Sequence, residues 1–247
     1  SEEMNFKHGI AMCYKSMGTS YLYKGNYEKS SMAFEKALRL FDEANDKTNR
    51  ARTLNNMGGI AMYRGDYPKA LNFFFEALQF YEASDDKQNT ASTLNNIGII
   101  YFRQGKYEMA LDYYKKSLNI HENMADNHGI ATESLNIAGI YSQIGKYDDA
   151  LAFCFKALKI DEESGNKEGM ADDYSNIGTI NAMKKDFVKA REFFEKALEI
   201  DNKTGNKRGI AAALNNIGLT YSEEGNQNAA IDFFAKSCVS LLKQLSK

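Results

Sequence analysis

The chain repeats its own pattern every forty residues over its whole length, and this period restricts the fold more than any other feature. Comparing residue i with residue i+40 places small residues in one column, at Gly18, Gly58, Gly98, Ala138, Gly178 and Gly218. A second column holds aromatic residues and one cysteine, at Phe34, Phe74, Tyr114, Cys154, Phe194 and Phe234. The phase never shifts, so the 247 residues hold six repeats without an insertion. Such an array buries its apolar surface between neighbouring repeats.

Each repeat is predicted to contain two α-helices. Between residues 88 and 103 the apolar side chains follow the spacing of one helical face, and they do so again between 107 and 123. Gly105 separates the two segments, where helices commonly end in a left-handed residue. The single proline of the chain also suits an all-helical protein. We therefore expect an all-α fold.

The predicted organisation is one array over residues 1–247, with repeats at about 7–44, 47–84, 87–124, 127–164, 167–204 and 207–247. Residues 1–4 align with the last turn of a second helix at 161–164, so they are predicted to end a preceding repeat, with further sequence upstream. Lys185 replaces a turn glycine and is expected to adopt either a strained left-handed conformation or a different turn. The three widely spaced cysteines are expected to be reduced and buried.

The columns resemble those of the tetratricopeptide repeat (TPR) family, and the resemblance covers essentially the whole chain. The matching positions in the third repeat are Leu94, Gly98, Tyr101, Ala110, Tyr114 and Ser117. The usual TPR period is about 34 residues, and the forty-residue variant, with its linker GNKxG[IM]A at 165–171 and 205–211, is most similar to bacterial signalling proteins and sensor kinases. The resemblance implies a right-handed superhelical solenoid of six helix-turn-helix repeats, whose first helices line a concave groove.

Asparagine recurs on the first helix of five repeats. The main asparagine column is Asn56, Asn96, Asn136, Asn176 and Asn216, and the partial asparagine column is Asn55, Asn95 and Asn215. Asparagine is a poor helix former and is costly to bury unpaired. A helical wheel places both columns away from the second helix, and the resemblance then places them in the groove. There an amide could pair with the backbone of an extended peptide; alternatively, it could bond to the adjacent repeat.

Five further residues are predicted to line the groove in the first three repeats. They are Tyr23, Tyr63, Arg52, Phe102 and Arg103. Aromatic groups beside cations suit a peptide that has an apolar anchor and an acidic group or a carboxyl terminus. The alternative is that the aromatic rings pack between neighbouring first helices.

Composition and motifs argue against several classes of protein. The net charge is −2 and basic residues are spread evenly, which argues against a nucleic-acid partner. No apolar run is long enough to cross a membrane, so no membrane contact is expected from this segment. We find no catalytic constellation among the residues and predict no enzyme activity, no cofactor and no metal site.

The predicted function is non-catalytic binding of a peptide or protein segment in the concave groove, as the sensing part of a larger bacterial signalling protein. The alternative is a constitutive assembly scaffold or a self-association module, for example a homodimer. The predicted location is the cytoplasm, or the periplasm if the chain is an excised sensor region.

Overall fold

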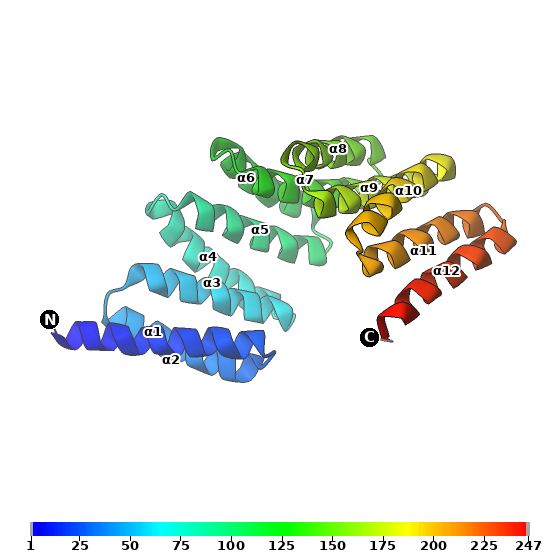
Figure 1. Ribbon diagram of the computed structural model, residues 1–247. Helices are drawn as coiled ribbons and strands as arrows, with labels where there is room; N and C mark the ends of the chain where they lie inside the picture. The colour runs from blue at the N-terminus through cyan, green and yellow to red at the C-terminus, as the bar shows by residue number, and fades with distance from the viewer. Residues whose placement is uncertain (1, 246–247) are drawn as a thin grey trace. The chain divides into compact units, whose positions relative to one another are not determined.

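The computed structural model describes residues 2–245, and within this range it contains twelve α-helices and no strand. Consecutive helices pack as pairs, one pair for each forty-residue repeat (Figure 1). The predicted all-α fold of six helix pairs is confirmed. The helices are α1 (Glu2–Tyr23), α2 (Tyr27–Glu43), α3 (Lys47–Tyr63), α4 (Tyr67–Ala83), α5 (Lys87–Arg103), α6 (Tyr107–Asn123), α7 (Asn127–Gln143), α8 (Tyr147–Ser164), α9 (Lys167–Met183), α10 (Phe187–Thr204), α11 (Lys207–Glu223) and α12 (Gln227–Leu245).

The chain forms two compact units of three repeats each. The N-terminal unit is Ser1–Asn123, which contains α1 to α6, and the C-terminal unit is Met124–Lys247, which contains α7 to α12. Within each unit, the odd-numbered helix is the first helix of its repeat. It packs against the second helix of the same repeat and against the second helix of the repeat before it.

Short turns with defined capping residues set the helix boundaries. Asp46, for example, accepts a hydrogen bond from the Asn49 backbone N–H at 3.0 Å and so caps the start of α3. The turns pass through one left-handed residue, which is glycine at Gly105 (φ 70°). Lys185 takes the same conformation with φ 63°, which is the first of the two alternatives that the sequence left open. A side chain at this φ costs some backbone strain.

The column of small residues brings the two helices of a repeat together. A Cβ added at Gly98 would lie 2.6 Å from the Tyr114 ring, so the ring occupies the place of the missing side chain. In the fourth repeat Ala138 replaces the glycine, and the opposing aromatic residue is replaced by Cys154 in the same apolar cluster. The extra methyl group is accommodated because the facing side chain is smaller.

Two expectations from the sequence need correction. Only Cys154 is buried, whereas Cys13 and Cys238 are exposed, because α1 and α12 are the first and last described helices and each has one face without a neighbouring repeat. In addition, α1 runs without a break from Glu2 to Tyr23, so residues 2–4 form its first turn and do not end a separate helix. No earlier described helix packs there to favour a turn over continued helical hydrogen bonding. Ser1 lies outside the described residues.

Candidate functional site

The main asparagine column lies on the solvent-facing side of the first helices α3, α5, α7, α9 and α11. Asn176 is exposed, and the other four side chains are half-buried. The amide of Asn136 donates to Glu133 Oε2 at 3.3 Å, one turn earlier on α7. In the described part of the chain the remaining four amides form no side-chain hydrogen bond, so their donors and acceptors are available to a ligand. They are Asn56, Asn96, Asn176 and Asn216.

The partial asparagine column behaves differently. Asn55 Oδ1 on α3 lies 3.3 Å from Thr93 Oγ1 on α5, although the Thr93 hydroxyl has a closer acceptor in the Asn89 carbonyl oxygen at 2.7 Å. Asn95 also has an interaction partner, whereas Asn215 is exposed. The Asn55 amide thus lies against the first helix of the next repeat, where the alternative interpretation would place it.

The predicted aromatic residues of the N-terminal unit are divided between packing and exposure. Tyr63 is 66% exposed, and its ring stacks on Tyr27 of the preceding repeat with centroids 6.4 Å apart. Phe102 is half-buried and lies 5.8 Å from the Tyr107 ring of its own repeat. Tyr23 is 87% exposed. Of these rings, Tyr23 is the one most available to a ligand.

Cationic side chains also lie among the predicted groove residues of the N-terminal unit. Arg52 and Arg103 are exposed, and Lys15 Nζ donates to Asn49 Oδ1 at 2.7 Å. Burial, and then the charge of Arg52, lower the pKa of Lys15. This lowering indicates that the two cations lie close enough to repel each other, an arrangement that an anionic group would relieve.

The C-terminal unit has an apolar pocket of about 300 Å³ between α9 and α11. Met183 and Leu219 line it and are 44% and 49% exposed. Asn216 of the main asparagine column also lines it, with Lys185 and Glu223 among the polar residues around it. A concave apolar surface with a few polar groups is the usual form of a ligand site. Asn216 was predicted from the sequence but the pocket was not, because Met183 and Leu219 fall in different columns of the forty-residue repeat.

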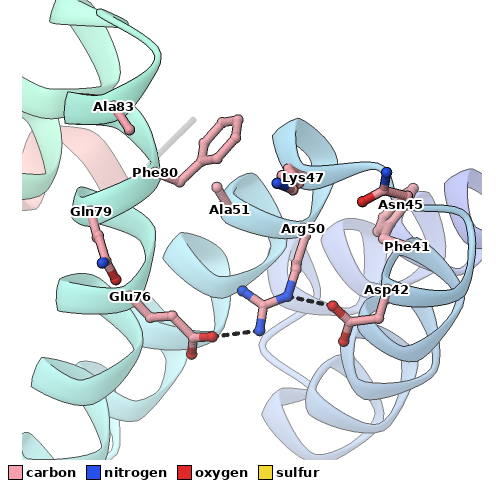
Figure 2. Close-up of a pocket in the computed structure, with 10 residues that line it drawn as sticks. All are labelled: Phe41, Asp42, Asn45, Lys47, Arg50, Ala51, Glu76, Gln79, Phe80 and Ala83. Carbon is pink, nitrogen blue, oxygen red and sulfur yellow. Dashed lines mark hydrogen bonds and ion pairs between the residues drawn. The ribbon is translucent and has the colours of Figure 1, made fainter.

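A larger pocket, of about 520 Å³, lies among α2, α3 and α4 of the N-terminal unit (Figure 2). The Arg50 side chain points into it between two carboxylates, where Nε donates to Asp42 Oδ1 at 2.5 Å and Nη2 donates to Glu76 Oε1 (Figure 2). No predicted site residue lines this pocket. The ionic bridge links three helices, so Arg50 stabilises the junction of two repeats.

A group of carboxylates on α8 and α9, here called the acidic cluster, was not identified from the sequence. It consists of Asp161, Glu168, Asp172 and Asp173. Asp173 is fully buried, and no N–H or hydroxyl donor of the described chain reaches its oxygens, so its hydrogen-bond partner is the Asp161 carboxyl, which requires that one of the two acids is protonated. Burial, and then the charge of Asp161, raise the pKa of Asp173 to about 7. The signal in the sequence is the column Thr53, Thr93, Glu133 and Asp173, where hydroxyl groups give way to carboxyl groups.

The structure also bears on metal sites and on membrane-spanning helices. In the described residues, no three His, Cys, Asp or Glu side chains are placed to hold a metal ion. None of the helices in the range 2–245 combines the length and apolarity needed to cross a membrane.

Comparison with known proteins gives a clear sequence match to one family. Sequence models described as tetratricopeptide repeat match residues 49–123, 130–203 and 174–238, and a second such model matches residues 11–43. No curated protein matches the whole sequence significantly.

Solved structures with similar folds share low sequence identity with the chain. A signal transduction ATPase with numerous domains (STAND) protein with a tetratricopeptide repeat sensor, from Pyrococcus horikoshii, has a TM-score of 0.82 at 17% identity, and the match covers 97% of this chain and 38% of that protein's chain. BtubC from P. vanneervenii has a TM-score of 0.76 at 20% identity, covering 91% and 92%. A Rap protein complexed with competence and sporulation factor has a TM-score of 0.62 at 15% identity, covering 97% and 76%. At these low identities, the structural similarities are evidence for a shared fold and not for a shared function.

Proposed function

Because this chain belongs to the tetratricopeptide repeat family, we propose that it is a non-catalytic module that binds an extended peptide or protein segment across the first helices of its repeats. We further propose that it forms the sensing part of a larger bacterial signalling protein. The ligand is held by backbone contacts to the main asparagine column and by apolar contacts in the pocket between α9 and α11.

The observation that carries the proposal is the meeting of two features at one place on α11. Asn216 has no hydrogen-bond partner in the described chain, and it lines a pocket that exposes Met183 and Leu219. An unpaired amide at the edge of an apolar depression can hold a peptide backbone while a side chain of the ligand fills the depression.

The comparisons support the signalling context by analogy. One similar structure is a Rap protein in complex with competence and sporulation factor, and another is a STAND protein with a tetratricopeptide repeat sensor. The chain matches 38% of the latter, so the repeats there form one part of a longer protein. An equivalent output region attached to this chain would read the change in repeat packing that ligand binding produces.

A specific observation favours the alternative function as a scaffold or homodimer. The last helix, α12, exposes several apolar side chains: Ile231 at 65%, Val239 at 50%, Leu241 at 44% and Leu242 at 61%. Exposed apolar residues gathered on one helix mark an interaction surface more often than solitary ones do. Sedimentation analysis would distinguish this alternative, because Leu242→Glu would dissociate a homodimer formed through α12.

The proposal is tested by selecting a random peptide library on the intact chain and on the triple variant Asn56→Ala, Asn96→Ala and Asn216→Ala. The matched control is Asn72→Ala, Asn119→Ala and Asn228→Ala, three exposed asparagines on second helices. We expect peptides that bind the parent and the control but not the folded triple variant. Absence of enrichment, or enrichment that survives the triple substitution, would refute the groove site and favour the scaffold.

A further inference from the structure

Neighbouring repeats within each unit are joined by one recurring apolar contact. The second helix of a repeat packs against the first helix of the next, and at the junction of α10 with α11 the residues Phe194 and Ile217 lie in one buried cluster. At the junction of α2 with α3 the corresponding residues Phe34 and Met57 do the same. Each junction therefore needs two apolar faces, one on a second helix and one on the first helix that follows.

On α1 the first-helix half of this contact is uncovered. Met17 is 46% exposed, whereas the five residues of the same column are at most 6% exposed: Met57, Ile97, Ile137, Ile177 and Ile217. Cys13 is exposed, although its column is buried in the five later repeats at Thr53, Thr93, Glu133, Asp173 and Ala213. We call this surface the head face, which consists of Phe6, Ile10, Cys13, Tyr14 and Met17.

On α12 the second-helix half of the contact is uncovered. Phe234 is half-buried, whereas the five residues of its column are at most 3% exposed: Phe34, Phe74, Tyr114, Cys154 and Phe194. Leu241 is 44% exposed, although Phe41 and Tyr81 in its column are buried. We call this surface the tail face, which consists of Phe234, Cys238, Leu241 and Leu242. The described chain thus carries both halves of a repeat junction without partners.

The tail face departs from the repeat pattern at Leu242. This residue is 61% exposed and stands where the other five repeats have polar side chains: Asp42, Glu82, Glu122, Glu162 and Asn202. Two internal junctions show what this position contacts. Asp42 Oδ1 accepts a hydrogen bond from Arg50 Nε at 2.5 Å, and Glu162 Oε1 accepts one from Tyr174 Oη at 3.3 Å. The residue at this position therefore faces two positions on the next first helix.

The head face has changed at the matching position. On α1 the columns of Arg50 and Tyr174 are occupied by Ile10 and Tyr14, which are both half-buried. The register of an internal junction would therefore place Leu242 of one copy against Ile10 and Tyr14 of another. The ion pair that joins α2 to α3 is replaced by apolar residues on both sides, so the two faces complement each other.

The beginning of α1 extends the same match. The other first helices that follow a turn have Asp or Asn in the column of Phe6, whereas α1 continues as helix through this residue, which is 72% exposed. At the junction of α2 with α3, the Asp46 backbone N–H donates to the Phe41 carbonyl oxygen at 2.9 Å. Asp46 lies in the column of Phe6, and Phe41 lies in the column of Leu241. The same register thus places Phe6 beside Leu241.

We propose that the tail face of one copy docks on the head face of a second copy in the register of the internal junctions, so that the protein associates head to tail. A contact between two unlike faces leaves one of each free and so extends beyond two copies. It differs from the homodimer through α12 alone, in which one face meets itself. The inference goes beyond the proposed function, because neither face contains a residue of the main asparagine column.

The test is sedimentation of full-length variants that each keep one intact face. The head variant carries Ile10→Glu and Met17→Glu, and the tail variant carries Leu241→Glu and Leu242→Glu. The control is Met109→Glu with Val188→Glu, which adds the same charge at exposed apolar residues of α6 and α10. We expect the parent and the control to grow past dimers between about 1 μM and about 1 mM of chain. Each face variant alone should remain a monomer.

An equal mixture of the head variant and the tail variant should form a dimer and grow no further, because it contains one intact tail face and one intact head face per pair. This mixed dimer would also show that both variants are folded. A monomeric parent, or a mixture that stays monomeric, would overturn the inference. Dimers of the head variant alone would also overturn it, because they would show that α12 pairs with itself.

A second measurement tests the register. Leu242→Asp should weaken the association of the parent at least about tenfold, because it places a carboxylate against Ile10 and Tyr14. Adding Ile10→Arg to the same chain copies the pair formed by Asp42 and Arg50, and should recover about threefold at low salt. No recovery would overturn the proposed register.

Discussion

The two units join their repeats through the same backbone turn but with different side chains. In the N-terminal unit the last turns of α2 and α4 bury aromatic residues, Phe41 and Tyr81. In the C-terminal unit the equivalent positions at the ends of α8 and α10 hold Asp161 and Asp201. All four turns contain a left-handed residue, with φ between 54° and 75°. One backbone path thus tolerates an apolar or an acidic side chain, provided that its neighbours change as well.

The compensating changes lie in the linker motif of the C-terminal unit. Asn206 Nδ2 donates to Asp201 Oδ1 at 2.8 Å, and a Cβ at Gly209 would lie 2.1 Å from Asp201 Oδ2. In the N-terminal unit the position of Gly209 is occupied by Asn49 and Asn89. The glycine and asparagine of GNKxG therefore accommodate a junction carboxylate. The GNKxG motif therefore has a structural role at the junction between repeats, which does not depend on the family resemblance.

The largest effect is expected when the acidic junction is transplanted into the N-terminal unit. Tyr81→Asp would remove a side chain that is 1% exposed and leave a buried carboxylate facing Asn89 in place of glycine. We expect a loss of about 4 kcal/mol in the free energy of unfolding, measured by denaturant titration. Tyr81→Phe is the control and should cost under about 1.5 kcal/mol. A small effect of Tyr81→Asp would show that the two junction types are interchangeable residue by residue.

Placing the asparagine of the N-terminal junctions into the C-terminal unit should reduce the free energy of unfolding by a smaller amount. Gly169→Asn introduces a side chain within 2.0 Å of Asp161 Oδ2, so the carboxylate must move away from Asn166. We expect a loss of about 2 kcal/mol. In a double-mutant cycle, Asp161→Ala should remove most of this penalty because it removes the clash. Additive effects of the two substitutions would contradict the coupling.

The dependence of stability on pH should differ between the units because of Asp173. Its pKa is raised to about 7 in the folded protein, so the folded state holds a proton that the unfolded state has lost. This contribution to stability is therefore lost as the pH rises from about 4 to about 7. Asp173→Thr, which copies Thr93, should gain about 2–3 kcal/mol more at pH 8 than at pH 5. An equal change at both pH values, measured by thermal unfolding, would contradict the raised pKa.

The smallest effect is expected at the ionic bridge of the N-terminal unit. Arg50 binds Asp42 and Glu76, whereas the corresponding residue of the fifth repeat is Met170. Because the Arg50 side chain is 30% exposed, Arg50→Met should change the free energy of unfolding by no more than about 1 kcal/mol. It should also remove part of the salt dependence of unfolding. A salt dependence identical to that of the parent would show that the two ion pairs of Arg50 do not contribute to the free energy of unfolding.

The sequence predicted the six helix pairs because a forty-residue period with two helical faces leaves few other ways to bury the apolar columns. The glycine column marked the turn at Lys185, but the sequence did not decide between the left-handed conformation that the structure shows and a different turn. The exposure of Cys13 was missed, because burial of its column depends on a preceding repeat that α1 lacks among the described helices.

The candidate site was predictable only in part. The main asparagine column follows from periodicity and a helical wheel, and its role in binding remains a prediction. That Asn55 meets Thr93 depends on a contact between residues thirty-eight apart in the sequence. The burial of Asp173 against Asp161 depends on packing between α9 and α8 of the preceding repeat, which a single helix cannot reveal.

Binding of a peptide ligand by the main asparagine column can be measured directly once a library peptide is in hand. The most direct measurement is calorimetric titration of the best library peptide into the parent, the triple variant at Asn56, Asn96 and Asn216, and the matched triple at Asn72, Asn119 and Asn228. We expect the affinity to fall at least about tenfold, or about 1.4 kcal/mol, in the first variant and to stay unchanged in the second. Equal affinity for all three proteins would contradict it and would move the ligand to another surface.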